Sequence, residues 1–243
     1  MHNIHSSHHI LICNWNGHGK AIVDLLLADE VELARDIVIV ADLEESPYEE
    51  GGVLFVRGNP CKDEVLEKAN INKADTAIIL GGGGCDLAAA DSQAVLTALA
   101  VEAKRPKLYS CVVIMEPDNK KHLRHAKADE VICIGEMVDQ VLVQSTLNHG
   151  LSGLLSDLLT FTGSCEIYKV KMPKEYVGLT FAEAASKASA DCRFTMIAIE
   201  PEGARDCGDS GRYIFSLDSD RKLEEGDSAF IIANTLSKDL QRA

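Results

Sequence analysis

The sequence predicts an α/β protein: a Rossmann-like, doubly wound parallel sheet with crossover helices, then a small β-rich α+β C-terminal lobe. Short β-branched runs alternate with longer amphipathic segments from residue 10 onward, which is typical of βα units around a parallel sheet. After residue 164 the pattern changes to short strands separated by turn-forming residues. At 243 residues and 46% hydrophobic content, the chain is long enough for one large domain or two smaller ones.

The strands of the expected sheet are six short runs rich in β-branched residues. They span residues 10–13, 37–41, 53–56, 76–80, 109–114 and 131–134. Between them, apolar residues that recur at three and four positions predict helices. These helices cover residues 19–28, 62–70, 87–103 and 119–126. Six strands alternating with helices fit one sheet of the Rossmann type.

Two further helices are expected after the sixth strand, over residues 136–147 and 151–159. The second carries a leucine stripe with the spacing i, i+3, i+4, i+7, i+8: Leu151, Leu154, Leu155, Leu158 and Leu159. Because the six-stranded unit is already complete, the stripe faces another subunit or the second domain, or it packs inside the chain. Gly150 and Gly153 flank its start and give the connection hinge freedom.

The C-terminal part predicts strands over residues 166–172, 194–200, 212–217 and 228–233, with one helix over 181–188. We therefore expect three parts. Residues 1–148 form the Rossmann-like domain with its crossover helix, residues 149–163 a hinge and dimerisation helix, and residues 164–243 the C-terminal lobe.

Charge and cysteine content restrict the class of protein. A net charge of -14 repels nucleic acid and anionic lipid, so neither is an expected partner. The eight cysteines form no CxxC pair, which favours reduced thiols in the cytosol. No apolar stretch reaches the roughly 18 residues of a membrane helix, and we expect a soluble chain. The early histidines, His2, His5, His8 and His9, indicate an unstructured lead-in or, alternatively, a metal chelate.

The stretch "LICNWNGHGK", residues 11–20, resembles a strand that enters a dinucleotide-binding turn. Aligned on GxGxxG, it supplies Asn14, Asn16 and Gly19, with an additional Gly17. Asparagine tolerates the left-handed region best among non-glycine residues, so both asparagines can hold the bends. The Asn16 side chain either occupies the path of the phosphates or donates a hydrogen bond to them. A Walker P-loop is excluded because Ala21 follows Gly19-Lys20 where Ser or Thr is needed.

Other candidate ligand contacts come from the ends of the next strands. Asp42 can accept both ribose hydroxyls, which favours NAD, AMP or ATP over NADP. "RGNP" places Gly58 and Asn59 after the third strand, and the four glycines 81–84 follow the fourth, as anion-binding amides or as a flexible surface loop. The expected binding set is Asn14, Asn16, Gly17, Gly19, Asp42, Gly58 and Asn59, with NAD, ATP or ADP as cofactor.

Several longer motifs stand in a characteristic order: "FVRGNP", "VLEKANINKADTAIIL", "MEPDNKKHLRHAKADEVI" and "MPKEYVGLTFAEA". With these motifs the chain resembles the RCK family, the regulator of potassium conductance domains, over nearly all of residues 8–234. The resemblance implies a ligand-sensing regulatory domain on the cytosolic face of the membrane. It implies homodimers formed through residues 136–159, an octameric gating ring, and a potassium channel pore or membrane subunit as partner.

Two departures from the family pattern narrow this expectation. Soluble regulatory subunits of potassium uptake systems generally keep an intact GxGxxG, whereas "NWN" is more similar to RCK domains attached to channels; the uptake subunit remains an alternative. Calcium-gated relatives place carboxylates at the end of the fourth strand and along the fifth. Here only Asp86 and Glu116 remain nearby, so calcium is possible and no metal ligand is predicted.

The competing class is an NAD-dependent oxidoreductase, which needs a proton-transfer residue beside the nicotinamide. The sequence has no Tyr-xxx-Lys pair. The histidines beyond the lead-in are His18, His122, His125 and His149, and only His18 adjoins the turn. No catalytic residue is predicted, and the expected chemistry is differential binding of a ligand.

Overall fold

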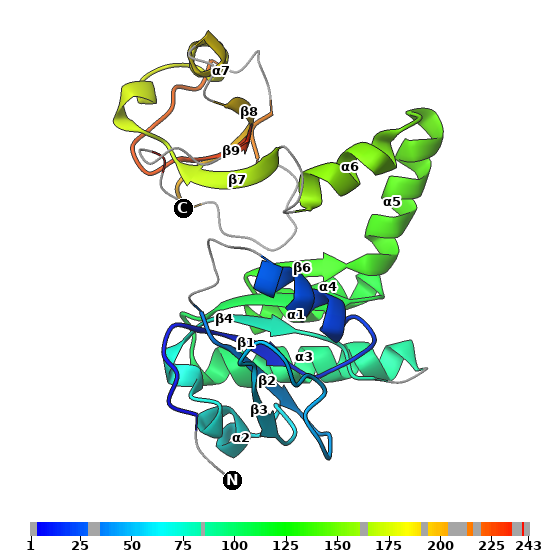
Figure 1. The fold of residues 1–243 in the computed structure, drawn as a ribbon. Coiled ribbons are helices and arrows are strands. Elements are labelled where there is room, and N and C mark those ends of the chain that lie inside the picture. Colours follow the sequence, from blue (N-terminus) through cyan, green and yellow to red (C-terminus); the bar gives the residue numbers. More distant parts are fainter. Residues whose placement is uncertain are drawn as a thin grey trace. The chain divides into compact units, whose positions relative to one another are not determined.

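The computed structural model describes residues 4–28, 35–83, 86–160, 165–190, 194–203, 213–215, 220–234 and 240. The chain divides into two compact units, Met1–Val143 and Gln144–Ala243, and the division falls inside one helix, α5 (Ile134–Leu147). Figure 1 shows both units.

The first unit is built on a parallel sheet of six strands in the order β3-β2-β1-β4-β5-β6 (Figure 1). The strands are β1 (His9–Cys13), β2 (Ile37–Ala41), β3 (Leu54–Arg57), β4 (Ala74–Ile79), β5 (Tyr109–Ile114) and β6 (Glu130–Cys133). The strand order reverses between β1 and β4, and ligands of such sheets bind at the carboxyl ends beside this reversal. The predicted Rossmann-like fold is confirmed.

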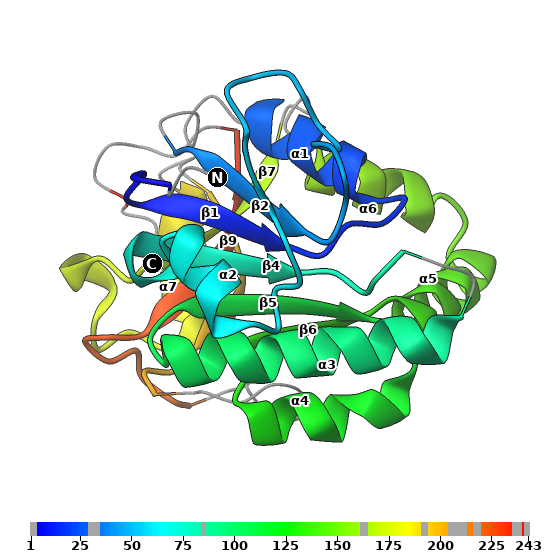
Figure 2. The same ribbon diagram turned by 90° about the horizontal axis from the view of Figure 1, so that it is seen from below.

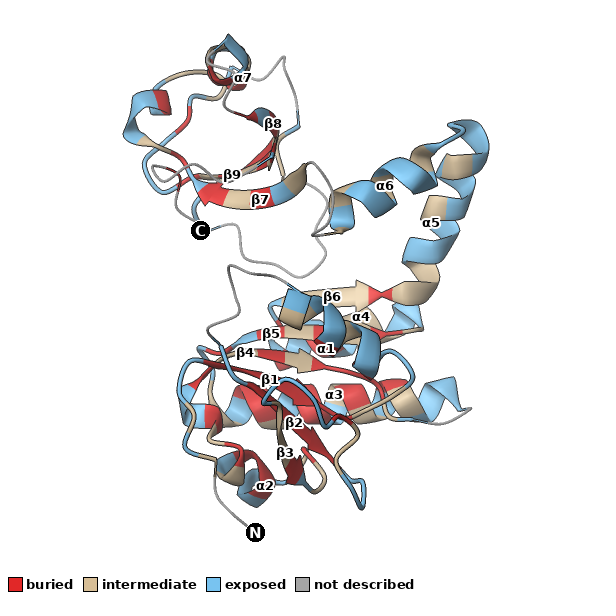
Figure 3. Cartoon of the chain, in the orientation of Figure 1, coloured by how far each residue is buried: buried red, intermediate tan, exposed pale blue. Residues whose placement is uncertain are grey.

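Helices cover both faces of this sheet (Figure 2). The helix α1 (Gly19–Ala28) lies on one face, and α2 (Asp63–Lys68), α3 (Leu87–Lys104) and α4 (Lys120–Ala126) lie on the other. Two apolar cores result, because alternate residues of a strand point to opposite faces. In β1, Leu11 belongs to the core under α2, α3 and α4, whereas Ile12 belongs to the core under α1. Both residues are 0% exposed, and β1 has the colour of buried residues in Figure 3.

The lead-in from Ile4 is bound to the first unit, so the expectation of an unstructured segment is wrong there. The Ile4 amide donates to the Lys68 carbonyl (2.9 Å), and the His8 amide donates to the Lys73 carbonyl (2.8 Å). Ile4 also packs against the core. His9 belongs to β1 and is fully buried, and this burial lowers the pKa of its imidazole. Residues 1–3, including His2, lie outside the described residues.

The two helices after β6 contain no buried residue. They are α5 and α6 (Leu151–Leu159), joined at Gly150, whose φ of 93° a side-chain-bearing residue rarely adopts. The exposed large apolar side chains of this pair are Met137, Val138, Leu142, Val143, Leu147, Leu154 and Leu159. Leu151, Leu155 and Leu158 are half-buried, and α6 contacts β7 (Glu166–Lys171). The predicted leucine stripe is therefore only partly covered by the chain itself.

The second unit contains an antiparallel sheet of three strands in the order β7-β9-β8. The other strands are β8 (Thr195–Glu200) and β9 (Ser228–Ala233), and α7 (Phe181–Ala190) packs against them. The strand predicted over residues 212–217 is not found in its described part, where only Ile214 forms a bridge, to Ile199. Residues 212, 216 and 217 lie outside the described residues.

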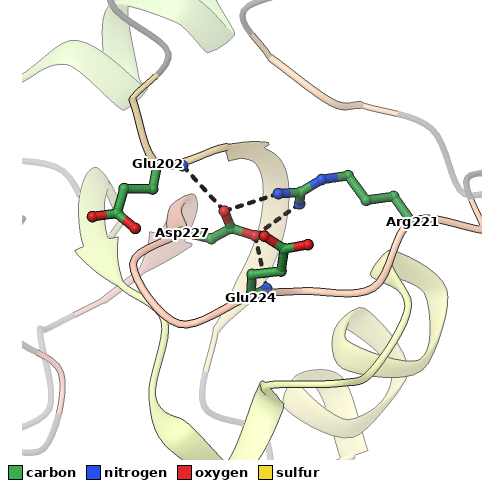
Figure 4. A network of polar contacts seen from close by, with 4 residues as sticks. All are labelled: Glu202, Arg221, Glu224 and Asp227. Atoms are coloured by element: carbon green, nitrogen blue, oxygen red, sulfur yellow. Dashed lines mark hydrogen bonds and ion pairs between the residues drawn. The ribbon is translucent and has the colours of Figure 1, made fainter.

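A buried carboxylate joins the turns of this second unit (Figure 4). Asp227 is 1% exposed and accepts hydrogen bonds from both terminal nitrogens of Arg221, at 2.7 and 3.0 Å. The backbone amides of Glu202 (3.1 Å) and Glu224 (3.0 Å) also donate to it. Burial alone would raise the pKa of Asp227, but Arg221 and the two amides outweigh burial and lower it. The carboxylate therefore stabilises the approach to β9 as an anion.

Candidate functional site

The carboxyl ends of four neighbouring strands meet beside the reversal of strand order. The Asn14 amide donates to the Val40 carbonyl (2.8 Å) and the Leu80 amide to the Cys13 carbonyl (3.0 Å). The Gly58 amide donates to the Ala41 carbonyl (2.9 Å), which places it beside the residue preceding Asp42. We call this region, which comprises Asn14, Asp42, Gly58 and Gly81 with the residues next to them, the carboxyl edge.

Asn14 holds the bend that was predicted for it, but its side chain points into the protein. Its φ is 66°, in the left-handed region, and the residue is 3% exposed. The amide nitrogen donates to the Leu80 carbonyl (2.8 Å) and to the Thr97 hydroxyl (3.3 Å). Its oxygen accepts from Gln93 (3.0 Å). Asn14 therefore fastens β1 to β4 and α3.

Asn16 adopts no left-handed conformation, so the expectation that both asparagines hold bends by this means is wrong for Asn16. Its carboxamide lies between two segments far apart in sequence. The nitrogen donates to the Gly81 carbonyl (3.1 Å), and the oxygen accepts from the His18 amide (3.0 Å). Asn16 thus joins the turn between β1 and α1 to the loop that follows β4.

Trp15 is a residue of this region that the sequence analysis did not single out. Its indole lies against Gly19, where an added Cβ would be 2.7 Å from the ring. Its carbonyl oxygen lies beside Gly83, 3.2 Å from where a Cβ would be. Its position between two asparagines of the turn was the sequence feature that could have indicated this role. Gly17 is exposed and has no neighbouring atom within 4 Å of its ideal Cβ position.

The glycines after β4 are explained by close packing. A Cβ on Gly82 would be 2.0 Å from the Gln93 side-chain oxygen, and one on Gly81 would be 3.2 Å from the Ala90 Cβ. Gly81 is buried, which contradicts the surface-loop expectation at that position. Gly84 lies outside the described residues. The run of glycines lets this loop approach α3 and Trp15 closely.

Asp42 is the carboxylate at the carboxyl edge that is open to a ligand. It is exposed and forms no hydrogen bond or ion pair with any described residue. Gly58 has a φ of 148°, and a Cβ there would be 2.7 Å from the Val65 side chain. The Asn59 side-chain oxygen accepts from the Cys61 amide (2.8 Å), so it serves the local turn. Of the predicted polar side chains, Asp42 alone is unengaged among the described residues.

The loop that carries Asp42 is held against α1. The Tyr48 hydroxyl donates to Asp24 (2.8 Å), and Lys20 pairs with the same carboxylate (3.0 Å). The Lys20 ammonium also lies 5.3 Å from the centre of the Tyr48 ring. These hydrogen bonds, first that of Tyr48 and then that of Lys20, lower the pKa of Asp24. This contact could not be predicted from the sequence, because the loop shows no periodic pattern.

Carboxylates near β4 and β5 serve the protein's own backbone. Asp86 caps α3 by accepting from the amides of Ala88 (3.0 Å) and Ala89 (3.1 Å). Asp91, 1% exposed, accepts from the amides of Met115 (2.8 Å) and Glu116 (2.9 Å). Within the described ranges, no group of three or more His, Cys, Asp or Glu residues is placed to hold a metal ion.

The histidines outside the lead-in, His18, His122, His125 and His149, are all exposed. Of these, His18 adjoins the carboxyl edge, where its backbone amide is bound by Asn16. Among the described residues, no helix is both long enough and apolar enough to cross a membrane.

Comparison with known proteins decides the family. Residues 10–134, from β1 to the start of α5, match the model of the TrkA-N domain. The chain belongs to the TrkA-N domain family. This TrkA-N protein is 28% identical over 188 residues to the calcium-gated potassium channel TvoK of Thermoplasma volcanium. The match covers 76% of the chain and 53% of TvoK, so the chain spans about half the length of that relative.

Solved structures similar to this TrkA-N protein include the human SLO3 gating ring, with a TM-score of 0.69 and 19% identity over 93% of the chain and 44% of that chain. The GsuK RCK domain is similar with a TM-score of 0.44 and 21% identity, over 93% of the chain and 44% of that chain. GsuK structures bound to NAD and to ADP also match. The resemblance to RCK domains noted in the sequence is confirmed.

Proposed function

We propose that the chain is a ligand-sensing regulatory domain of a potassium channel and works in a cytosolic gating ring. The proposal is supported by membership of the TrkA-N family, by the similarity to TvoK, and by the fold shared with the SLO3 gating ring. The observation that carries it is the unengaged Asp42 carboxylate at the carboxyl edge, beside the reversal of strand order. No catalytic residue takes part, and regulation follows from unequal ligand affinity for two states of the ring.

The ligand we propose is an adenine nucleotide such as NAD, ATP or ADP. The exposed Asp42 carboxylate would accept hydrogen bonds from the ribose hydroxyls. Gly17, which is exposed just before α1, would let the ligand approach the helix amides, whereas Gly19 would let Trp15 pack closely against the helix start. Gly58 would lie beside the ribose, whereas Asn14 and Asn59 would support the turns through the bonds already described. Calcium is the second ligand to test, because TvoK is calcium-gated by name.

We further propose that two copies pair through α5 and α6, whose apolar side chains the chain leaves exposed. Residues 149–163 would then act as hinge and dimerisation helix between a Rossmann-like domain, 1–148, and a C-terminal lobe, 164–243. Pairs would assemble into an octameric ring on a channel pore, present on the same polypeptide or on a separate membrane subunit. A ligand that binds one ring shape better than another would move the pore by that difference in affinity.

The test is calorimetric titration of the purified chain with NAD, ADP, ATP and calcium. Asp42→Ala should weaken nucleotide binding by about 1 to 3 kcal/mol, because the ribose hydroxyls lose their charged acceptor. Glu44→Ala changes an exposed carboxylate of the same loop and serves as the matched control, with unchanged affinity expected. Equal affinity of wild type and Asp42→Ala would exclude the ribose contact. If calcium alone binds, the nucleotide assignment is wrong.

A further inference from the structure

Asn16 satisfies two backbone groups on opposite sides of the carboxyl edge with one carboxamide. Its oxygen accepts from the His18 amide (3.0 Å), immediately before α1. Its nitrogen donates to the Gly81 carbonyl (3.1 Å), after β4. Asn14 makes a parallel contact to the preceding carbonyl, that of Leu80 (2.8 Å). The two side chains therefore tie the turn after β1 to the loop after β4 at successive positions.

The position of Asn16 is the one at which a dinucleotide turn normally has a glycine, so that the pyrophosphate can reach the backbone. A phosphate oxygen in that place accepts hydrogen bonds from amides at the helix start. Here the carboxamide oxygen of Asn16 already accepts from the His18 amide. Its nitrogen donates a hydrogen bond to the Gly81 carbonyl, whose oxygen would otherwise repel an anion. Through its oxygen the side chain thus makes one contact that a phosphate oxygen would make, without the charge of a phosphate.

Asp42, the expected ribose acceptor at the same edge, differs from Asn16 in that its side chain is not engaged by the described residues. Asp42 is exposed and makes no hydrogen bond with the described residues. Tyr48 and Asp24 hold its loop to α1 (2.8 Å) without using Asp42. A ribose can therefore reach its acceptor directly, whereas a phosphate must first displace Asn16 from two hydrogen bonds.

We propose that Asn16 is the specificity-determining residue of the carboxyl edge: it occupies the phosphate position, so that the site recognises the adenosine part of a ligand and gains little from its phosphates. This inference rests on the proposed nucleotide function. It assigns adenosine-containing ligands as a class, with adenosine, AMP and ADP bound at similar affinity by the wild-type chain.

Trp15 provides the readout, because it is the single tryptophan of the chain. Its indole lies on Gly19 at the start of α1, and its carbonyl lies beside Gly83 after β4. The start of α1 therefore contacts the fluorophore itself, and the loop after β4 lies beside the backbone of the same residue. A ligand that enters this edge, or loss of the Asn16 contacts, should change its emission or its quenching by acrylamide.

The experiment titrates the whole chain with adenosine, AMP and ADP and follows Trp15 emission. In wild type, adenosine and ADP should bind within about threefold of each other. In Asn16→Gly, ADP should bind about 10-fold more tightly, the gain expected when a phosphate oxygen accepts the hydrogen bond of the freed His18 amide, while adenosine affinity stays the same. The substitution leaves the net charge unchanged, so long-range repulsion of the phosphates is equal in both proteins. Asn16→Ala removes the same carboxamide without adding glycine flexibility and should give the same order of affinities.

Asn70→Gly is the matched control. Asn70 is left-handed, with a φ of 55°, and its side-chain nitrogen donates to the Ser6 carbonyl (2.8 Å) near the amino end of β1. The same asparagine-to-glycine change there should leave all three affinities as in wild type. Without ligand, acrylamide should quench Trp15 more strongly in both Asn16 variants than in Asn70→Gly.

Two results would overturn the inference while leaving the nucleotide site intact. Wild type could bind ADP more than about 10-fold tighter than adenosine, or both Asn16 variants could lose ADP affinity, which would make Asn16 a phosphate ligand. If neither wild type nor any variant responds to the three ligands in fluorescence or melting temperature, the nucleotide function itself fails and this inference fails with it.

Discussion

Strand β1 and helix α6 are rich in the same kind of side chain and bury it to opposite extents. All five residues of β1 are buried, and Leu11 is 0% exposed. The nine residues of α6 include five leucines and none is buried; Leu154 is 55% exposed and Leu159 is 69% exposed. Apolar composition thus indicates that a surface has to be covered, but the element's neighbours decide whether the chain covers it.

The neighbours of the two elements differ in a simple way. β1 lies between β2 and β4, with one core under α1 and another under α2, α3 and α4. α5 and α6 follow the completed sheet, and neither helix has a buried residue. Contiguous exposed apolar surface on a soluble domain marks a contact with another molecule. If α5 and α6 pair as proposed, β1 serves folding and α6 serves assembly, and each role can be tested by substitution.

The largest effect is expected at β1. Leu11→Ala should lower the free energy of unfolding by about 2 to 5 kcal/mol, because it leaves a cavity in a fully packed core. Urea denaturation of the two proteins measures this loss. Leu25→Ala in α1, where the side chain is 49% exposed, is the control and should change stability by less than about 1 kcal/mol. Similar losses in both variants would mean that burial does not distinguish the two positions.

The second prediction concerns the exposed apolar side chains of α5 and α6. Leu142→Glu combined with Leu154→Glu should raise the dissociation constant of the dimer by about 100-fold, because it places charges in an apolar contact. Analytical ultracentrifugation over a range of concentrations gives this constant. The charge control is Leu25→Glu, at an exposed position outside α5 and α6. A wild-type chain that stays monomeric at high concentration would refute the dimer, and an unaffected double variant would place the contact elsewhere.

The third prediction concerns the buried carboxylate of Asp227 and its ion pair with Arg221. Asp227→Asn should reduce stability by about 2 kcal/mol at pH 7, since Arg221 loses its counter-ion. The folded-state pKa of Asp227 is lowered, so the stabilisation is present above its unfolded value of about 3.9 and is lost as pH falls through the folded value. Thermal melts from pH 7 to pH 2 should therefore converge for the two proteins. Asp220→Asn, at an exposed position, should match wild type throughout.

The fourth prediction concerns the buried carboxylate of Glu102, whose contribution to stability should change with pH in the direction opposite to that of Asp227. Glu102 lies near the end of α3 and accepts a hydrogen bond from the Ser110 hydroxyl (2.6 Å). Its pKa is raised, mainly because burial disfavours the charged carboxylate. Its stabilising contribution belongs to the protonated form: it is full below the unfolded value of about 4.3 and is lost as pH rises through the folded pKa. Glu102→Gln should therefore increase stability at pH 7 by on the order of 1 kcal/mol and lose this advantage near pH 3. Exposed Glu64→Gln is the control; destabilisation by Glu102→Gln at pH 7 would refute the assignment.

The elements that follow from local patterns were predictable. The helices over residues 19–28 and 151–159 and the strands over 37–41, 109–114 and 228–233 occur with the expected bounds. Their periodicity is a property of neighbouring residues, so it can be read without the fold. The left-handed bend at Asn14 also followed from its residue type. The strand over 212–217 was wrong in its described part, because a β-branched run becomes a strand only when a neighbour pairs along its whole length.

The candidate site was predictable only as a set of positions. Strand ends and turn residues placed Asp42, Gly58 and Gly19 near one another, because parallel strands end at the same edge. Whether these residues bind a ligand remains a prediction, as does the division into 1–148, 149–163 and 164–243. The role of Trp15 and the engagement of Asn59 were missed, since both depend on which atoms lie within a few ångströms.

The sequence by itself determined the α/β class, the order of strands and helices and the family, because those depend on periodicity and on motifs along the chain. The tertiary structure alone decided what the two asparagines do. Asn14 and Asn16 find their partners 66 and 65 residues away, at Leu80 and Gly81. A hydrogen bond acts over about 3 Å of space regardless of distance along the chain, so only the folded sheet reveals which groups it joins.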